Sequence, residues 1–231
     1  MTFSITPSVF DLLPALRVGI LSVKGANNAG EHPEITQLLR DAEASVRLRF
    51  TEENYGSDPG ITAFQEAHRA FGNNPKRYYP SHYALLKRVI KGGTLPLINP
   101  LVDLYNTVSL RYTLPVGGED VDRCEGNILL DRADGSEPFI PLGETNNDPP
   151  DPGEVVYKDD AGVLCRKMNW READRTKLTA DTKNAVLVVE SLLPTDSLED
   201  IMGELSSLVS RFCEGSQERA LLTRESPSMD L

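Results

Sequence analysis

Three polar side chains lie along one side of a helix that the sequence predicts over residues 99–112. Asn99, Asp103 and Asn106 are spaced by four and three residues, which places two amides and a carboxylate in one line. Apolar residues form the opposite, core-facing stripe: Leu101, Leu104, Tyr105, Val108 and Tyr112. The polar line suits a binding cleft. The simpler interpretation is that Asn99 caps the helix, while the other two bond the local backbone.

Two further groups that could take part in binding or catalysis follow this helix. The sequence Pro-Val-Gly-Gly predicts a tight turn, in which Gly117 and Gly118 bring backbone N–H groups close to the polar line. Glu190 interrupts the apolar run of a predicted strand, 184–193. A lone carboxylate in a buried strand needs a partner or a purpose. The alternative is that Glu190 points outward at the end of the strand.

A cationic segment precedes the helix. No acidic residue stands between Glu66 and Asp103. This interval holds Arg69, Lys76, Arg77, Lys87, Arg88 and Lys91, together with Tyr78, Tyr79 and Tyr83. Cations interleaved with aromatic rings suit a phosphate backbone whose bases can stack. The alternative is an ordinary solvated helix surface.

The composition and the net charge argue against several classes of function. The chain has 231 residues and a formal net charge of −11, which works against nonspecific adhesion to DNA or RNA. Three cysteines without a CxxC motif indicate free thiols, and the three histidines form no metal-ligand pattern. We therefore expect no metal site and no cofactor. Without a leader or a long apolar segment, we expect a cytoplasmic protein with no membrane or DNA partner.

The order of the predicted elements indicates the α+β class, with a mixed, mostly antiparallel sheet flanked by helices. Strands are expected at 17–24, 127–131, 154–158, 162–168 and 184–193. Helices are expected at 34–50, 61–71, 82–92, 99–112 and 198–212. The last helix has the clearest amphipathic period, and it covers a sheet face or forms a dimer contact. We expect one domain over 1–217 and a flexible tail over 218–231.

The central stretch, NPLVDLYNTVSLRYTLPVGGEDVD, resembles a segment of the B3/B4 domain in the phenylalanyl-tRNA synthetase β subunit, which reads approximately N-x-V-D-x-T-N-x-V-x-L-E-x-G-Q-P-x-H-A-F-D. The matching positions are Asn99, Val102, Asp103, Asn106, Val108, Leu110, Pro115 and Asp120. TADTKNAVLVVE is similar to the later D-E-T-x-N-V-x-L-E segment of that domain. The resemblance covers roughly residues 60–193 and implies a free-standing member of this family.

In the synthetase, this domain hydrolyses tyrosine wrongly attached to phenylalanine tRNA, so the resemblance implies an editing pocket. Glu190 matches the substrate-recognition glutamate of the family, and Asp103 and Asn106 match its motif residues. Gly117 stands where the family has a pocket histidine. The stretch NWRE, which begins at Asn169, replaces a glycine-rich wall. These departures prevent a transfer of tyrosine specificity.

The resulting hypothesis is a deacylase that acts in trans on mischarged tRNA. Gly117 and Gly118 would bind the developing oxyanion, and Asp103 or Glu190 would hold the α-ammonium group or orient water. Asn99, Asn106 and Asn169 would position the substrate. Lys76, Arg77, Lys87, Arg88 and Lys91 would contact tRNA phosphates. The competing hypothesis is a non-catalytic module that binds RNA or an amino acid, which the missing histidine and the net charge favour. A third hypothesis, an unrelated hydrolase, has no Ser-His-Asp or metal signature to support it.

Overall fold

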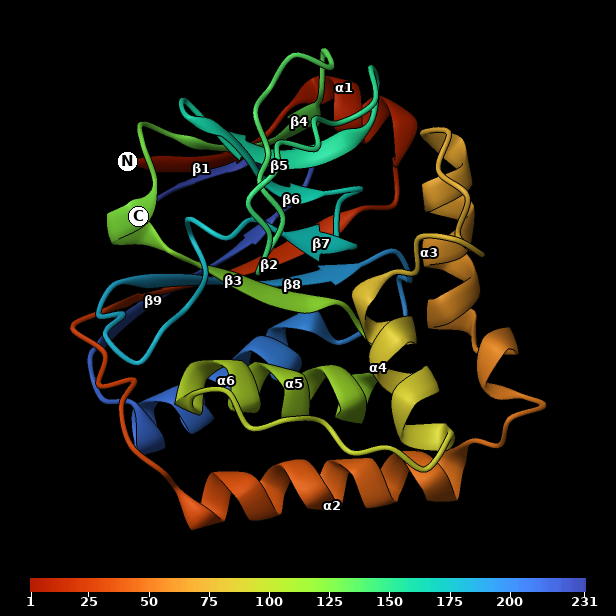
Figure 1. The fold of residues 1–231 in the computed structure, drawn as a ribbon, viewed down its shortest axis with the longest axis vertical. Coiled ribbons are helices and arrows are strands. Elements are labelled where there is room, and N and C mark those ends of the chain that lie inside the picture. Colours follow the sequence, from red (N-terminus) through yellow and green to blue (C-terminus); the bar gives the residue numbers. More distant parts are fainter.

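Two β-sheets packed face to face form the centre of the molecule, and helices cover the outer face of one of them (Figure 1). The computed structural model describes residues 1–231. The six-stranded sheet has the order β10-β1-β4-β5-β6-β7, and the four-stranded sheet has the order β3-β8-β2-β9. The first is mixed, because β1 and β4 are parallel, and the second is antiparallel throughout. The predicted α+β class is confirmed.

The strands are short, and most of them lie near the predicted positions. The six-stranded sheet consists of β1 (Thr2–Ile5), β4 (Ile128–Arg132), β5 (Val155–Asp159), β6 (Gly162–Arg166), β7 (Arg171–Glu172) and β10 (Ser228–Asp230). The four-stranded sheet consists of β2 (Arg17–Lys24), β3 (Val116–Asp120), β8 (Ala185–Ser191) and β9 (Ser216–Leu222). The sequence did not predict β1, β3, β7, β9 or β10.

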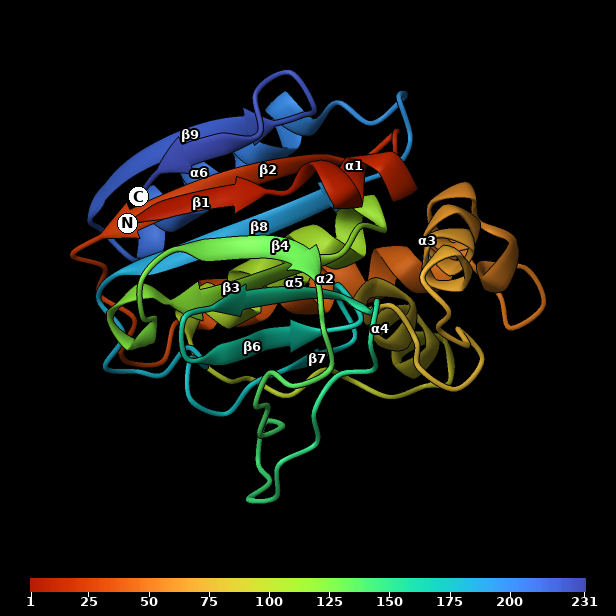
Figure 2. The ribbon, with the colours of Figure 1, turned by 90° about the horizontal axis from the view of Figure 1, so that it is seen from above.

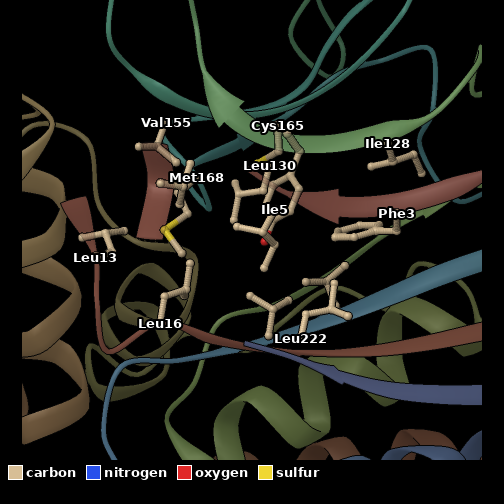
Figure 3. Close-up of a cluster of buried hydrophobic side chains, with 14 of the residues drawn as sticks. Phe3, Ile5, Leu13, Leu16, Ile128, Leu130, Val155, Cys165, Met168 and Leu222 are labelled. Carbon is tan, nitrogen blue, oxygen red and sulfur yellow. The ribbon is translucent and has the colours of Figure 1, made fainter. Parts of the chain in front are cut away.

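The main hydrophobic core lies between the two sheets (Figure 3). Strand β8 is buried along its whole length and is paired on both edges, with β2 and β3. Because successive side chains of a strand point to opposite faces, Val186 and Val188 enter this core, while Leu187 and Val189 face the helices. The same alternation directs Glu190 toward the six-stranded sheet.

The helices form two further layers. The free face of the four-stranded sheet is covered by α5 (Pro100–Tyr112) and α6 (Leu198–Phe212), and α2 (Pro33–Arg49) packs outside α5 (Figure 1). At one end of the sheets lie α3 (Pro59–Ala70) and α4 (Ser81–Ile90). The remaining helices are α1 (Pro7–Leu12) and the 3-10 turns Tyr55–Ser57 and Val121–Arg123. No helix combines the length and the apolar character needed to cross a bilayer.

Helix α6 covers the sheet as predicted. Its residue Leu205 is fully buried among apolar side chains of β2, β8 and α5. At Gly19 of β2 the backbone comes so close that an added Cβ would lie 2.6 Å from the sulfur of Met202. Gly19 therefore allows α6 to pack directly against β2.

The predicted flexible tail at 218–231 is wrong. Strand β9 pairs with β2 over seven residues, and β10 pairs with β1, so that Thr2 lies opposite Asp230. The two termini consequently lie side by side (Figures 1 and 2). The first part of the sequence SQERALL is polar because β9 is an edge strand, in which only Leu222 is buried. The predicted turn at 115–118 is also wrong, because residues 116–120 form β3.

Candidate functional site

A pocket opens between the two sheets near the carboxyl end of β8. Its apolar wall is part of the main core: Phe3, Ile128, Cys165, Met168 and Val188. Its polar lining is formed by Ser81, Glu119, Tyr157, Asn169, Glu172 and Glu190, with Gly117 and Gly118 beside them. The space open to water is about 40 Å³, which holds a few water molecules or a compact polar group. The rim includes the half-buried Ser81, the first residue of α4.

Glu190 lies inside this pocket and is only 2% exposed. The hydroxyl of Tyr157 donates a hydrogen bond to its Oε1 atom (2.5 Å), and Nδ2 of Asn169 donates one to its Oε2 atom (2.5 Å). Burial raises the pKa of Glu190 to about 7, although both hydrogen bonds act in the opposite direction. A carboxyl group in this state exchanges its proton near neutral pH.

The turn that carries Asn169 is held in an uncommon backbone conformation. Lys167 and Met168 have positive φ angles of 50° and 65°, a region that residues with large side chains rarely adopt. The buried carboxylate of Glu154 fixes this turn, because it accepts from the Lys167 N–H (2.8 Å) and from the Lys167 ammonium (2.7 Å). The turn directs the Asn169 side chain inward, toward Glu190.

A histidine fixes the orientation of the Asn169 amide. Burial lowers the pKa of His68 to about 4, so its ring is neutral at pH 7. Its Nδ1 accepts from Nδ2 of Asn73 (2.6 Å), which leaves the proton on Nε2 to be donated to Oδ1 of Asn169 (3.0 Å). The amide nitrogen of Asn169 then faces Glu190. The chain Asn73–His68–Asn169 thus positions the donor that the carboxyl needs.

The two glycines of β3 face opposite sides of the sheet. Gly117 lies opposite Val188 and faces the pocket, where an added Cβ would be 3.2 Å from Oε1 of Glu172. Gly118 faces the helices, and an added Cβ there would be 2.5 Å from Leu187. Position 118 therefore excludes a side chain, whereas a side chain at position 117 would require a small shift of the Glu172 carboxyl.

The hydrogen-bond pattern of β3 bears on the predicted oxyanion site. The Glu190 N–H donates to the Pro115 carbonyl oxygen (3.1 Å). Because the N–H groups of an antiparallel strand point toward its partner at every second residue, the Gly117 N–H points to β8 and the Gly118 N–H points away from it. Only Gly118 therefore keeps an N–H group available for a ligand.

Asn99 and Asp103 lie outside this pocket, so the predicted single cleft is wrong. Asn99 caps α5, accepting from the Val102 N–H (3.1 Å), and its own amide donates to the Leu178 carbonyl oxygen (3.0 Å). Asp103 accepts from the Ile98 N–H (3.0 Å), and burial raises its pKa.

These two residues line a separate groove between α5 and the start of α2. The half-buried Asn106 lines neither cavity. Every second residue of β8 faces the six-stranded sheet rather than the helices, which explains why the α5 stripe and Glu190 do not meet.

The predicted cations lie in the loop before α4, along this helix and at its end. Lys76, Arg77, Arg88 and Lys91 are exposed, whereas Lys87 is half-buried and donates to the hydroxyl of Tyr79 (2.8 Å). None of the five forms an ion pair with a carboxylate. Helix α4 begins at Ser81, whose N–H donates to the Asn169 carbonyl oxygen (2.9 Å). The cationic segment and the pocket are thus joined through this contact.

Four polar residues of the site were missed by the sequence analysis: His68, Glu119, Tyr157 and Glu172. His68 and Tyr157 carry no signal, because each stands singly in an amphipathic helix or an apolar strand. Glu119 adjoins the glycine pair, and Glu172 ends the stretch NWRE. Both of these stretches were assigned to the expected pocket, so these two acids could also have been predicted as site residues.

Comparison with known proteins identifies the family. No curated protein matches the chain. Among solved structures, it is similar to an N-terminal fragment of the phenylalanyl-tRNA synthetase β-subunit from Pyrococcus horikoshii, at 13% identity and a TM-score of 0.48. That match covers 94% of this chain and 49% of the fragment, so the chain spans about half the fragment's length. The B3/4 domain family matches residues 63–217, which is more than half of the sequence. The chain belongs to the B3/4 domain family.

Proposed function

We propose that this protein hydrolyses the ester bond of a mischarged aminoacyl-tRNA in trans, in the pocket between the two sheets. The observation that carries the proposal is Glu190, a buried carboxyl with a pKa of about 7, held by Tyr157 and Asn169 inside the pocket. A general base works best when its pKa lies near the working pH. The proposal differs from the sequence-based one in leaving Asp103 and Asn99 outside the site.

The reaction needs few groups. A water molecule attacks the ester carbonyl carbon, the bond from that carbon to the ribose oxygen breaks, and the products are a free amino acid and a tRNA with a free terminal hydroxyl. Glu190 accepts a proton from the attacking water and returns it to the departing ribose oxygen, which becomes the free hydroxyl. The Gly118 N–H, which points away from β8, is the available donor for the developing oxyanion. The second hydroxyl of the terminal ribose can assist by orienting the water.

The tRNA fits outside the pocket. With about 40 Å³ open to water, the pocket takes a compact polar group of the aminoacyl end, while the rest of the substrate, including the terminal adenosine, stays at the rim near Ser81. From there the acceptor stem can run along α4, where Lys87, Arg88 and Lys91 have no carboxylate partner. Unpaired cations next to the rim are what a phosphate backbone requires.

The test is a deacylation panel, in which purified protein is incubated with tRNAs charged with many correct and incorrect amino acids. We expect hydrolysis of at least one mischarged species. Glu190→Gln keeps the volume but removes the base, and we expect the rate to fall by about 100-fold or more. Glu218→Gln is the matched control, because Glu218 is an exposed strand glutamate without a hydrogen-bond or ion-pair partner. An unchanged rate in the Glu190 variant would sink this assignment.

A second candidate is a module that binds RNA or an amino acid without hydrolysing the ester. It is favoured by one observation: the Gly117 N–H points to the neighbouring strand, which leaves one oxyanion donor where two were predicted. If no charged tRNA is hydrolysed, while Glu190→Gln still weakens the binding of an amino acid, this candidate holds.

A further inference from the structure

Two carboxyl groups that the proposed mechanism does not use face the same pocket. Glu119 stands on β3 and Glu172 on β7, and both line the cavity with Glu190. Glu119 is 7% exposed. The Oε2 atom of each side chain is shielded from solvent and has no hydrogen-bond partner. The two carboxyl groups lie close enough to share a hydrogen bond, yet these two oxygens can still accept from a donor on a ligand.

No cation of this chain is free to pair with them. Arg175 acts on the charge of Glu119, but its guanidinium is bound by the Asp159 carboxylate. Arg171, which adjoins Glu172, pairs with Glu144 (2.5 Å). A buried carboxylate without a counter-ion is costly, and two of them together cost more.

The pair therefore binds a proton more strongly than a solvated glutamate does. Burial raises the pKa of Glu119, and the nearby charge of Glu172 raises it further. Burial also raises the pKa of Glu172. Two interacting carboxyl groups release their protons in separate steps, so the pair keeps its last proton to a higher pH than an isolated glutamate. A cation that entered the pocket would replace this proton and donate to both carboxylates.

Gly117 makes room for this pair. The Glu172 carboxyl lies 3.2 Å from the place where a side chain at position 117 would begin. Glu119 lies two residues further along β3, on the same face, opposite Val186. The glycine and the two glutamates thus form one arrangement, contributed by β3 and β7 together.

We propose that Glu119 and Glu172 bind the primary ammonium group of the amino-acid ligand. This inference deepens the proposed function and rests on its pocket. An ammonium group has three N–H donors on a compact centre, which suits the two unpartnered oxygens and a volume of about 40 Å³. The group has two possible sources: the α-ammonium of any aminoacyl ester, or the terminal ammonium of a lysine-like side chain.

Small probes test the inference without tRNA. Binding to the full chain is measured by calorimetry for glycinamide, which has an α-ammonium, and for N-acetylglycinamide, which has none. Nα-acetyl-lysinamide carries only the side-chain ammonium. We expect one ammonium probe to bind at least tenfold more tightly than N-acetylglycinamide, and which probe does so identifies the source. Equal binding of the charged and neutral probes overturns the inference.

Two further readouts keep the result independent of folding defects. In wild-type protein, binding of the ammonium probe should release protons, measured across a range of pH in buffers of different ionisation enthalpy. Glu119→Gln and Glu172→Gln should each weaken binding at least tenfold, with Glu218→Gln as the unaffected control. Because each substitution removes a buried charge, neither should lower the melting temperature. Absence of proton release, or unchanged affinity in both folded variants, contradicts the inference.

The outcome is separable from that of the proposed function. Ammonium binding without ester hydrolysis would leave this site intact and remove the catalytic proposal. Ester hydrolysis without ammonium binding would do the reverse. In that case the substrate would be held by Glu190 and the tRNA contacts alone.

Discussion

A buried carboxyl such as that of Glu190 makes the stability of the chain depend on pH. Its pKa rises from 4.5 to about 7 on folding, so the folded state binds an extra proton between these values. Its contribution to stability is complete below pH 4.5 and is lost as the pH rises through 7. Relative to wild type, Glu190→Gln should therefore gain about 3 kcal/mol of unfolding free energy between pH 4.5 and 8.

Denaturant unfolding at closely spaced pH values measures this difference. Comparing the variant with wild type cancels the contributions of Glu119, Glu172 and His68, which titrate in both proteins. Glu218→Gln should run parallel to wild type throughout. A constant difference between Glu190→Gln and wild type would mean that Glu190 titrates as a solvent-exposed carboxyl.

Among individual residues, some members of the site could be predicted from the sequence and others could not. Glu190 was visible because a carboxylate in an otherwise apolar strand is unusual, and its burial bears out that reasoning. Asn99, in contrast, satisfies the local capping rule that was its simpler interpretation. The partners of Glu190 were not visible. Tyr157 contacts it directly and His68 acts through Asn169, and both contacts join residues distant in the sequence, which no local pattern of a single sequence encodes.

At the scale of elements, periodicity identified the helices and the buried strands, whereas edge strands escaped it. Strand β3 contains two glycines and looks like a turn, yet β8 supplies its hydrogen bonds. Strand β9 is mostly polar because it forms the edge of the sheet. In both cases long-range pairing outweighs local preference. The position of Glu119 depended on this unpredicted strand.

Helix α6 offers a test of packing at this scale. Leu205 is fully buried against the four-stranded sheet, so Leu205→Ala should lower the free energy of unfolding by about 2–5 kcal/mol. Ser207→Ala, an exposed position on the same helix, should change it by less than about 0.5 kcal/mol. Both values follow from chemical denaturation. A small effect at Leu205, accompanied by a change in oligomer mass, would assign the helix to a subunit interface instead.

At the scale of the whole molecule, the formal charge of −11 conceals an uneven distribution. Many basic residues elsewhere are neutralised in ion pairs: Arg166 and Lys167 are bound by Glu154, and Arg175 is bound by Asp159. The cations from Lys76 to Lys91 are not neutralised in this way. They lie at the end of the sheets where α3 and α4 stand (Figure 1), and Ser81, the first residue of α4, lines the pocket. The sequence showed this asymmetry, and the structure adds its closeness to the pocket.

Replacing Lys87, Arg88 and Lys91 together by Glu should therefore weaken tRNA binding without unfolding the protein. If each cation neutralises one phosphate, the slope of log affinity against log salt should become shallower by about 2–3. Filter binding or fluorescence anisotropy at several salt concentrations measures both quantities.

The matched control reverses Lys24, Arg123 and Lys183, which are exposed and form no ion pair. They lie at the end of β2, just after β3 and just before β8, far from α4 along the strands. This variant has the same net charge as the first, so a general repulsion between protein and tRNA would weaken both alike. A local phosphate contact would weaken only the α4 variant. Equal losses in the two variants would show that α4 is an ordinary solvated surface, and that tRNA, if it binds, approaches the pocket from another side.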